Sequence, residues 1–430
     1  MTDSLIVVLD DVIAGNLERL PDGKLRFDYT EEYRERPGAT PISISMPSQI
    51  RSHTDAAITP WLWGLLPDND AVLTRWGRQF HVSTSSPFSL LATQIGEDCA
   101  GAVRFAPPEE IDRVLSRPGG VTWLTEDEIA QRLRDLREDS TSWLGRSFTG
   151  QFSLAGAQAK TALLFEDGRW GVPTGSNATT HILKPAVGGF DDHDLNEHLC
   201  LDAARRAGLV VVSTKISRFG DETVVVVDRY DRWKLGSEIH RIHQEDLCQA
   251  SALAPSLKYQ NEGGLSPADI AQLFRSSMPR RFADDAVWRF ADALIWNWLI
   301  AGTDAHAKNY SLLLAEDQVR LAPLYDVASA LPYDIHETKL KFAMKIGGDY
   351  RVAPIRNNWP KAAQELGLDA DGLVTRVRAL AAAAPDAFTD AARESDVEAL
   401  HRSLPILLVD LVAERSMHCM QAVRNVAEAI

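Results

Sequence analysis

Apolar and polar residues recur at intervals that change from one region of the chain to the next. Near the N-terminus, Leu5–Leu9 is a short apolar run typical of a strand, and Pro41–Pro47 alternates apolar and polar residues between two prolines, as an edge strand does. Ile58–Leu66 is mostly apolar and runs into Pro67-Asp68-Asn69, which predicts a helix stopped by a turn. We therefore expect residues 1–108 to form a small α/β subdomain.

A connecting segment is expected at residues 109–147. Pro107-Pro108 and Pro118-Gly119-Gly120 are typical of a linker. Thr125 and Glu128 have the spacing of a capping box, which predicts a helix to about Arg137. Because acids and bases alternate along that helix, we expect it to present a solvated face.

From residue 148 the pattern is one of short strands. A loop containing Gly156 leads into a strand at Lys160–Phe165, and Asp167-Gly168 is typical of a hairpin turn. The next strand, Thr180–Pro185, carries Lys184 just before its closing proline.

An amphipathic helix and two more strands complete this region. The helix is expected at Asp194–Ala207, with Gly208 as its stop. The strands are expected at Lys215–Phe219 and Thr223–Val227, followed by the connector Asp228–Arg232. We expect residues 148–243 to form one small lobe.

Helical periodicity dominates from about Gln244. Val287, Phe290, Leu294 and Trp298 form an apolar stripe that predicts a core helix ending near Gly302. The chain is thus predicted to be α+β, with two lobes, an N-terminal α/β subdomain and an all-helical C-lobe at residues 244–430.

Composition narrows the function classes. The net charge of −15 over 430 residues argues against a direct, nonspecific hold on DNA or on an anionic membrane. The N-terminus lacks a signal-peptide pattern, and no apolar run reaches membrane length. Cys99, Cys200, Cys248 and Cys419 are scattered without a C-x-x-C pair, which favours free, mostly buried thiols and a cytoplasmic location.

Candidate chemistry is concentrated in the stretch WLIAGTDAHAKNYSLLL. Asp304 and Asn309 lie five residues apart, and Asp326 follows on a second loop. Phosphoryl transfer uses such a set, with one carboxylate to orient a hydroxyl and an amide plus a carboxylate to hold Mg²⁺. Spacing alone also fits a solvated turn that caps a helix.

A phosphate loop and a lysine would complete such a site. Ser153–Lys160 reads SLAGAQAK, in which small residues would let backbone N–H groups approach phosphate oxygens, although it lacks the three glycines of G-x-G-x-x-G. Lys184 could contact the α/β-phosphates and be held by Glu197 of the next helix. The alternative is a plain loop and a lysine at the rim of a sheet.

Two further residues lie between Asp304 and Asn309. We expect His306 to order the loop by hydrogen bonding rather than to act as the base. Lys308 could meet negative charge in the transition state or be an ordinary exposed lysine.

All these features occur in the order that a kinase requires, and the phrases that carry them resemble the HipA toxins of bacterial toxin–antitoxin pairs. The N-terminal phrases SISMP and LWGLLPDND resemble the same family, so the likeness covers most of the chain. The remaining matching phrases are SLAGAQAKTALL, THILKP, NEHLCLDAARRAGL, VVDRYDR, QEDLCQA, GTDAHAKNYSLLL and LAPLYDVASALP.

The resemblance implies a protein-kinase-like, two-lobed serine/threonine kinase that uses ATP and Mg²⁺. It implies a serine of an aminoacyl-tRNA synthetase as the substrate, typically the glutamyl enzyme, with translation and growth arrested as the result. It also implies a small HipB-like helix-turn-helix antitoxin as the partner, through which DNA is bound only indirectly.

Matched by motif, Asp304 takes the catalytic position, Asn309 and Asp326 the metal positions, Lys184 the phosphate position and Ser153 that of an autophosphorylated serine. Asp228, Arg229 and Tyr230 fall on the connector that would meet adenine. The other residues expected near the nucleotide are Ala155, Gly156, Ala157, Gln158, Lys160, His306, Lys308 and Tyr325.

The sequence departs from the family pattern in two places and leaves two alternatives. Ala159 stands where the family loop has an acid, and the connector has Asp228-Arg229-Tyr230 where Glu-Arg-Phe is expected. One alternative is a small-molecule kinase, against which the N-terminal subdomain argues. The other is a catalytically idle nucleotide-binding co-repressor, against which the complete set of Lys184, Asp304, Asn309 and Asp326 argues.

Overall fold

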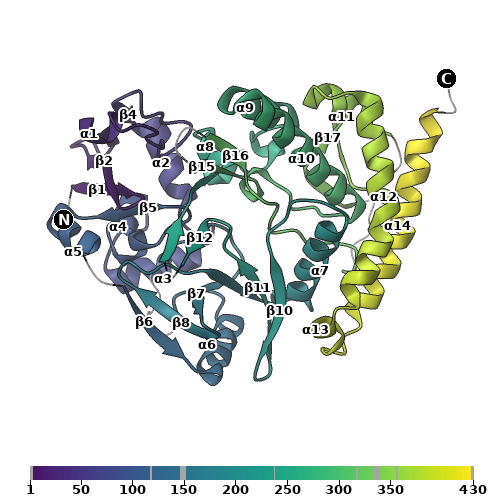
Figure 1. The fold of residues 1–430 in the computed structure, drawn as a ribbon, viewed down its shortest axis with the longest axis horizontal. Coiled ribbons are helices and arrows are strands. Elements are labelled where there is room, and N and C mark those ends of the chain that lie inside the picture. The colour runs from purple at the N-terminus through teal and green to yellow at the C-terminus, as the bar shows by residue number, and fades with distance from the viewer. Residues whose placement is uncertain are drawn as a thin grey trace.

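The computed structural model describes residues 3–116, 119–145, 152–236, 238–315, 318–333, 339–354 and 357–427. Figure 1 shows three parts in chain order: an N-terminal subdomain (purple to blue), a sheet-based small lobe (blue to teal) and a larger C-lobe (green to yellow). The structure is α+β with two lobes. Within the described ranges, no helix is both long and apolar enough to cross a membrane.

The N-terminal subdomain is an antiparallel sheet of order β4-β3-β2-β1-β5 covered by short helices. Trp61 and Leu62 of α2, with Leu65 and Leu66 just after its end, pack into this core, and all four are at most 1% exposed. The elements are β1 (Ser4–Leu9), β2 (Val12–Arg19), β3 (Leu25–Tyr29), α1 (Glu31–Arg34), β4 (Ser52–Thr54), α2 (Asp55–Gly64), α3 (Asp70–Phe80), α4 (Pro87–Leu91), η1 (Gln94–Glu97), β5 (Val103–Ala106), η2 (Pro108–Glu110) and α5 (Ile111–Ser116).

The prediction of an edge strand at Pro41–Pro47 is wrong. Only an isolated bridge joins Ser43 to Met46. The segment instead contacts the C-lobe, because the Ile44 N–H donates to Glu245 Oε1 at 2.7 Å and Ser45 Oγ donates to the Gln249 carbonyl at 3.2 Å.

The small lobe is an antiparallel sheet of order β10-β11-β9-β7-β8-β6. Asp167 and Gly168, both at positive φ, form the expected β7–β8 turn. The elements are β6 (Gly120–Leu124), α6 (Glu126–Glu138), β7 (Thr161–Glu166), β8 (Arg169–Thr174), β9 (His181–Pro185), α7 (His193–Arg206), β10 (Thr214–Phe219), β11 (Glu222–Asp228), β12 (Arg232–Leu235) and β13 (Glu238–Arg241).

The segment expected to be a linker is built into this lobe. β6 pairs with β8, and α6 begins with the expected Thr125–Glu128 capping box. The face of α6 that carries Ile129, Ala130 and Leu133 is buried against the sheet rather than solvated. Charged residues on its other face had hidden this apolar stripe.

The C-lobe contains helices and two small sheets, so the expectation of an all-helical lobe is wrong. The apolar run Ser311–Ala315 forms a strand between β14 and β16, because it pairs its backbone with both neighbours. The strands are β14 (His243–Asp246), β15 (Ser311–Ala315), β16 (Gln318–Leu321), β17 (Lys341–Ile346) and β18 (Asp349–Arg351). The helices are α8 (Leu247–Ala250), η3 (Pro255–Leu257), η4 (Gln260–Glu262), α9 (Pro267–Ser277), α10 (Arg280–Leu299), η5 (Ala307–Asn309), α11 (Trp359–Leu366), α12 (Ala370–Ala392), α13 (Ser395–Glu398) and α14 (Leu404–Ala427).

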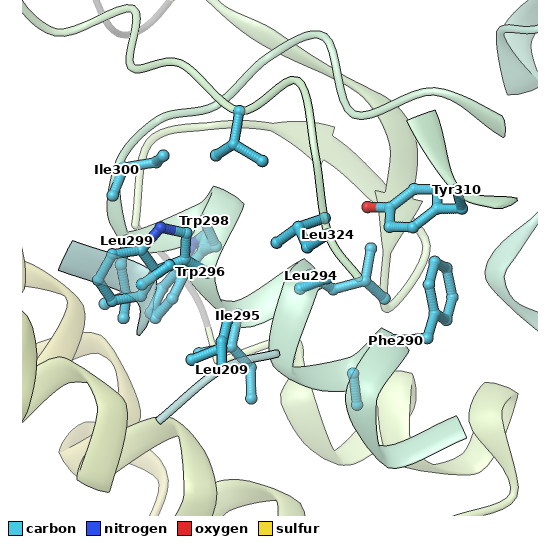
Figure 2. Close-up of a cluster of buried hydrophobic side chains, with 14 of the residues drawn as sticks. Leu209, Phe290, Leu294, Ile295, Trp296, Trp298, Leu299, Ile300, Tyr310 and Leu324 are labelled. Carbon is cyan, nitrogen blue, oxygen red and sulfur yellow. The ribbon is translucent and has the colours of Figure 1, made fainter. Parts of the chain in front are cut away.

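Helix α10 anchors the loops that follow it. Its predicted apolar stripe is buried, and the ring of Phe290 meets that of Tyr310 edge-on with centroids 5.0 Å apart. Figure 2 shows the side chains of α10 clustered with Tyr310 and Leu324, which lie just beyond Asn309 and just before Asp326 in the chain. Burial of each such side chain contributes about 1.5–3 kcal/mol, so both loops are fixed to one rigid core.

Candidate active site

The loop after α10 holds Asp304 and Asn309 together through the backbone. The Asp304 carbonyl accepts from Asn309 Nδ2 at 2.7 Å and from the His306 N–H at 2.8 Å. The Asp304 carboxylate stays 69% exposed and accepts from the Tyr259 hydroxyl at 2.7 Å. Since the amide nitrogen of Asn309 is used inside the loop, its amide oxygen is left for a cation.

His306 is buried against Tyr259, with ring centroids 5.1 Å apart in an edge-to-face arrangement. Its burial lowers the pKa of the imidazole, and the neighbouring Asp304 charge only partly opposes this. The expected ordering role is met by packing and by backbone hydrogen bonds rather than by the ring nitrogens, since Nδ1 has no partner among the described residues.

Lys184, Glu197 and Asp326 form a buried ion cluster. Lys184 Nζ lies 2.7 Å from Glu197 Oε1, as expected, and 2.8 Å from Asp326 Oδ1. Burial would lower the pKa of Lys184, but the two carboxylates outweigh it and raise that pKa above the ordinary value. Burial would likewise raise the pKa of Asp326, but the Lys184 and Lys160 ammonium groups hold it well below the usual range. Both residues are therefore charged at neutral pH.

Asp326 and the Asp304 loop are held next to each other by Tyr325. The Tyr325 hydroxyl donates to the Lys308 carbonyl at 2.8 Å and lies 2.7 Å from Ser311 Oγ. Asp326 itself adopts φ +58°, a left-handed conformation that costs a non-glycine residue free energy. This strain is maintained by the contacts on either side of it.

The predicted phosphate loop is anchored at Gly156 and Lys160. Lys160 Nζ donates to the Ala155 carbonyl at 2.7 Å and lies over the ring of Trp143. Its burial, together with the nearby positive charge of Lys184, lowers the pKa of Lys160 to about 8. Gly156 has φ +102°, a conformation that other residues rarely adopt, so this position favours glycine. Ala155, Gln158 and Ala159 are partly buried and Ala157 is exposed.

Ser153, the serine matched to the autophosphorylated position, is enclosed. Its side chain is fully buried, and its hydroxyl donates to the Leu65 carbonyl of the N-terminal subdomain at 2.6 Å. Modification of this hydroxyl requires the loop to leave its present position. Ser147 and Thr149, which precede Ser153 and could be modified in its place, lie outside the described residues.

Lys308 is not an exposed lysine. Its ammonium group is 3.2 Å from Asp68 Oδ1 and 3.4 Å from Asp246 Oδ2. Burial would lower the pKa of Lys308, but these carboxylates raise it above the ordinary value. Asp68 comes from the N-terminal subdomain, so this ion pair crosses between two parts of the chain.

The connector Asp228–Arg232 joins the small lobe to the N-terminal subdomain through a second ion cluster. The Arg229 side chain is 1% exposed and pairs with Asp231 at 2.7 Å and with Asp98 at 3.6 Å, so it cannot reach a nucleotide. Asp228 pairs with His181 at 3.1 Å. The Tyr230 ring stacks on Tyr325 with centroids 5.6 Å apart, and its hydroxyl donates to Gln244.

Sequence reasoning missed several residues of the site, namely Asp68, Asp246, Lys258 and Tyr259. Asp68 was taken as part of a turn, and the others lie in short segments without periodicity. The one available signal was in the phrase QEDLCQA, where Asp246 and Gln249 form a capping box that fixes the Asp246 side chain at a helix start.

Two family models match this sequence. The one described as the HipA N-terminal domain matches residues 5–106, and the one described as the HipA-like C-terminal domain matches residues 152–388, more than half of the chain. The chain belongs to the HipA family.

Relatives support the assignment to the HipA family. A protein of Sinorhizobium fredii that carries the name of a kinase is 32% identical over 362 residues, 84% of each chain. The serine/threonine-protein kinase toxin HipA of Shewanella oneidensis is 28% identical over 402 residues, 86% of each chain. The solved structure of HipA, HipB and operator DNA from that organism aligns over 99% of both chains at TM-score 0.84 and 24% identity, which shows the same fold.

The residues of this HipA-family site fit a nucleotide and Mg²⁺. Among the described residues, no three His, Cys, Asp or Glu side chains gather to hold a metal on their own. Mg²⁺ in kinases is held by one or two protein oxygens together with phosphates, and Asn309 and Asp326 offer such oxygens on adjacent loops. Lys184 and Lys160 add the positive charge that phosphates require. When bound, the metal would neutralise charge on the transferring phosphate.

Proposed function

We propose that this HipA-family protein is an ATP-dependent serine/threonine-protein kinase. The observation that carries the proposal is the arrangement of Lys184 between Glu197 and Asp326, at 2.7 and 2.8 Å, beside the Asp304–Asn309 loop. A lysine–glutamate pair and a metal-binding aspartate must be in place together for phosphoryl transfer in protein kinases. The names of its relatives, two of which describe kinases, support the same activity.

Each residue has a part in the proposed reaction. The Asp304 carboxylate is exposed, and the residue is fixed by the hydrogen bond from Asn309 Nδ2 to its backbone carbonyl. The carboxylate can therefore accept the proton of a substrate hydroxyl. Lys184, fixed by two carboxylates, meets the phosphates of ATP. Lys160 adds a second cation beside the phosphate loop. Asn309 and Asp326 hold Mg²⁺.

The connector is assigned to adenine through its backbone. The Arg229 N–H already donates to the Thr180 carbonyl at 2.9 Å. The N–H of Tyr230 makes no backbone hydrogen bond among the described residues, so we assign it to the adenine ring. The change from Glu-Arg-Phe to Asp228-Arg229-Tyr230 does not alter such a backbone contact.

The finer biology follows the family. A HipB-like antitoxin is the proposed partner, since the HipA of the matched solved complex is bound to HipB and operator DNA. A serine of an aminoacyl-tRNA synthetase such as the glutamyl enzyme is the proposed substrate, with arrest of translation as the consequence. Ser153 is the proposed autophosphorylation site. Phosphate there would add about −1.5 to −2 charges and could not return to its buried place against Leu65.

Incubation of the purified protein with Mg-ATP tests the proposal. Phosphate should be found by peptide mass spectrometry on Ser153, and on a serine of the synthetase when it is added. The ATP affinity of the modified form should fall, because the charged loop can no longer dock. ATP binding without any phosphoryl transfer would instead favour a nucleotide-binding co-repressor, and transfer to a small molecule alone would favour a small-molecule kinase.

A further inference from the structure

One short segment of the N-terminal subdomain contacts both halves of the candidate active site. Residues Leu65–Asn69, here called the bridging segment, connect the end of α2 to the start of α3. Leu65 and Leu66 are buried in the subdomain core at 1% and 0% exposure. Asn69 caps α3 by accepting from the N–H groups of Ala71 and Val72. The segment is therefore held at both ends, with Asp68 between them.

The backbone of the bridging segment binds the phosphate loop. The Asp68 N–H donates to the Gly156 carbonyl at 3.0 Å, and the Leu65 carbonyl accepts from Ser153 Oγ at 2.6 Å. Asn69 Nδ2 adds a longer contact of 3.4 Å to the Ala157 carbonyl. Three successive parts of the phosphate loop are thus attached to a segment that precedes them by 88 positions in the chain.

The side chain of Asp68 binds the catalytic loop. Its two oxygens lie 3.2 Å from Lys308 Nζ and 3.5 Å from Lys258 Nζ. Lys308 directly precedes Asn309, and its carbonyl accepts from Tyr325, the neighbour of Asp326. The Lys258 carbonyl accepts from the Ala307 N–H at 3.2 Å. Of the two lysines that Asp68 holds, Lys308 is therefore part of the loop that carries the catalytic and metal-binding groups, and Lys258 is hydrogen-bonded to it.

These contacts are not required merely to dock the subdomain. Gly101 donates to Asp231, Ile44 donates to Glu245, and Arg232 pairs with Asp98, all away from Asp68. Asp68 contributes no apolar surface to the core. What Asp68 alone provides is a link in which one residue fixes the phosphate loop by its N–H and the catalytic loop by its carboxylate.

We propose that Asp68 is a positioning residue for phosphoryl transfer, and that the N-terminal subdomain sets the spacing of the phosphate loop and the catalytic loop through it. In this proposal the Lys308 ammonium group pairs with the Asp68 carboxylate and does not bind the phosphate. The inference rests on the proposed kinase function. Since transfer depends on placement to within about 1 Å, loosening this link should lower kcat by about 10- to 100-fold.

Asp68→Asn tests the proposal because it removes the charge and keeps the size and the backbone N–H. Asp70→Asn is the matched control, since Asp70 is exposed in the first turn of α3 and has the same charge. Three quantities are measured on the full chain: kcat and KM for phosphoryl transfer, thermal unfolding, and amide hydrogen exchange of peptides covering residues 153–160 and 303–310. Asp68→Asn should lower kcat more than it changes KM and should raise exchange in both peptides, with unfolding close to wild type.

A double-mutant cycle with Lys308→Gln sharpens the test. If Asp68 acts through Lys308, the double variant should be no slower than the slower single variant, whereas additive losses would overturn the link. Equal kcat and equal exchange in Asp68→Asn and Asp70→Asn would overturn the positioning role. Should Asp68→Asn fail to fold, Lys258→Met removes one partner of the same carboxylate and carries the same expectations.

Failure of the kinase function gives a different result. The wild-type protein would then bind ATP without transfer, and kcat would carry no information. Hydrogen exchange would still report the link, since raised exchange in both loops of Asp68→Asn needs no activity. Unchanged exchange there would overturn the structural part of the inference independently.

Discussion

Two ion clusters of the molecule differ in whether every carboxylate oxygen has a partner. The hinge cluster consists of Asp98, Arg229, Asp231, Arg232 and Arg241. Asp231 accepts from Arg229 at 3.0 and 2.7 Å and from the Gly101 N–H at 2.7 Å. Asp98 accepts from Arg232 at 3.0 Å and from Thr179 Oγ1 at 2.9 Å. Every carboxylate oxygen in this cluster is occupied.

The site cluster consists of Lys160, Lys184, Glu197 and Asp326, and its pairing is incomplete. Glu197 Oε2 has no hydrogen-bond partner among the described residues, and the Asp326 side chain remains 38% exposed. The hinge cluster uses arginines, whose planar forks bind carboxylates at fixed geometry, whereas the site cluster uses lysines, which shift their pKa more readily. Among the described residues, every carboxylate oxygen of the hinge cluster is bound and its buried atom without a partner is Arg241 Nε, whereas in the site cluster a carboxylate oxygen is left without a partner.

The largest effect is expected from Asp304→Ala, which changes the site without touching either cluster. Loss of a positioned base commonly costs a factor of about 10²–10⁴ in rate. Because the Asp304 side chain is exposed and its loop contacts use the backbone, the melting temperature should stay close to wild type. Phosphoryl transfer and thermal unfolding are measured on the same sample. Wild-type rates in a folded variant would remove Asp304 from the reaction.

Asp231→Ala should have the largest effect on stability. It leaves Arg229 and Arg232 buried with one partner fewer, and breaking a buried pair in this way costs about 3–5 kcal/mol. Urea unfolding measures the loss. Asp221→Ala, at a 98% exposed position, is the control and should change the free energy of unfolding little. If the two variants were equally stable, the hinge cluster would not stabilise the fold.

Asn309→Ala should weaken ligand binding at the site rather than the stability of the fold. The variant lacks one proposed oxygen ligand for Mg²⁺. Calorimetry should therefore show that the increase in ATP affinity caused by Mg²⁺ is about tenfold smaller, which corresponds to about 1.4 kcal/mol. Binding without Mg²⁺ should be nearly unchanged. An unaltered Mg²⁺ dependence would contradict the assignment of Asn309.

The smallest effect is a pH dependence that comes from Lys160. Its pKa in the folded protein is about 8, below the ordinary 10.5, because of burial and the charge of Lys184. ATP affinity should therefore weaken as the pH rises through about 8, where this cation is lost. Between the two pKa values the unfolded chain binds more protons than the folded one, so the free energy of unfolding should rise with pH there.

Lys160→Met isolates this contribution. Glu245, whose pKa burial raises to about 8, also titrates nearby, so the difference between the wild type and the variant is the informative quantity. In the variant, both the fall of ATP affinity and the rise of the free energy of unfolding with pH should be smaller above about pH 8. Identical pH profiles for the two proteins would show that Lys160 does not titrate near the nucleotide.

The sequence was informative for those site residues whose positions depend on the pattern of neighbouring residues in the chain. The strand ending in Lys184, the helix carrying Glu197 and the loop from Asp304 to Asn309 were all predicted, because each depends on periodicity or spacing within about 15 residues. The pairing of Lys184 with Glu197 followed from strand and helix being neighbours in the chain.

Links across long separations could not be predicted. Asp68 and Lys308 lie 240 positions apart, and Asp98 and Arg229 lie 131 apart, in turns and connectors without any repeating pattern. A charged residue in a turn looks the same whether it faces solvent or a partner from another lobe. For the same reason the sequence gives no sign that Ser153 is hydrogen-bonded to the Leu65 carbonyl, 88 positions earlier.

The position of β6 and α6 also determines where the chain can be cut for expression. The match to the C-terminal family model begins at residue 152, but a fragment starting there lacks both elements. It would expose Leu163, Val224 and Val226, which α6 covers, and would leave β8 as a bare edge strand. Such edges pair with other chains and aggregate. A fragment that omits the start of the chain should therefore begin no later than residue 119 if the sheet is to keep its outer strand and its covering helix, and it must reach further back to keep Asp98 and Asp68.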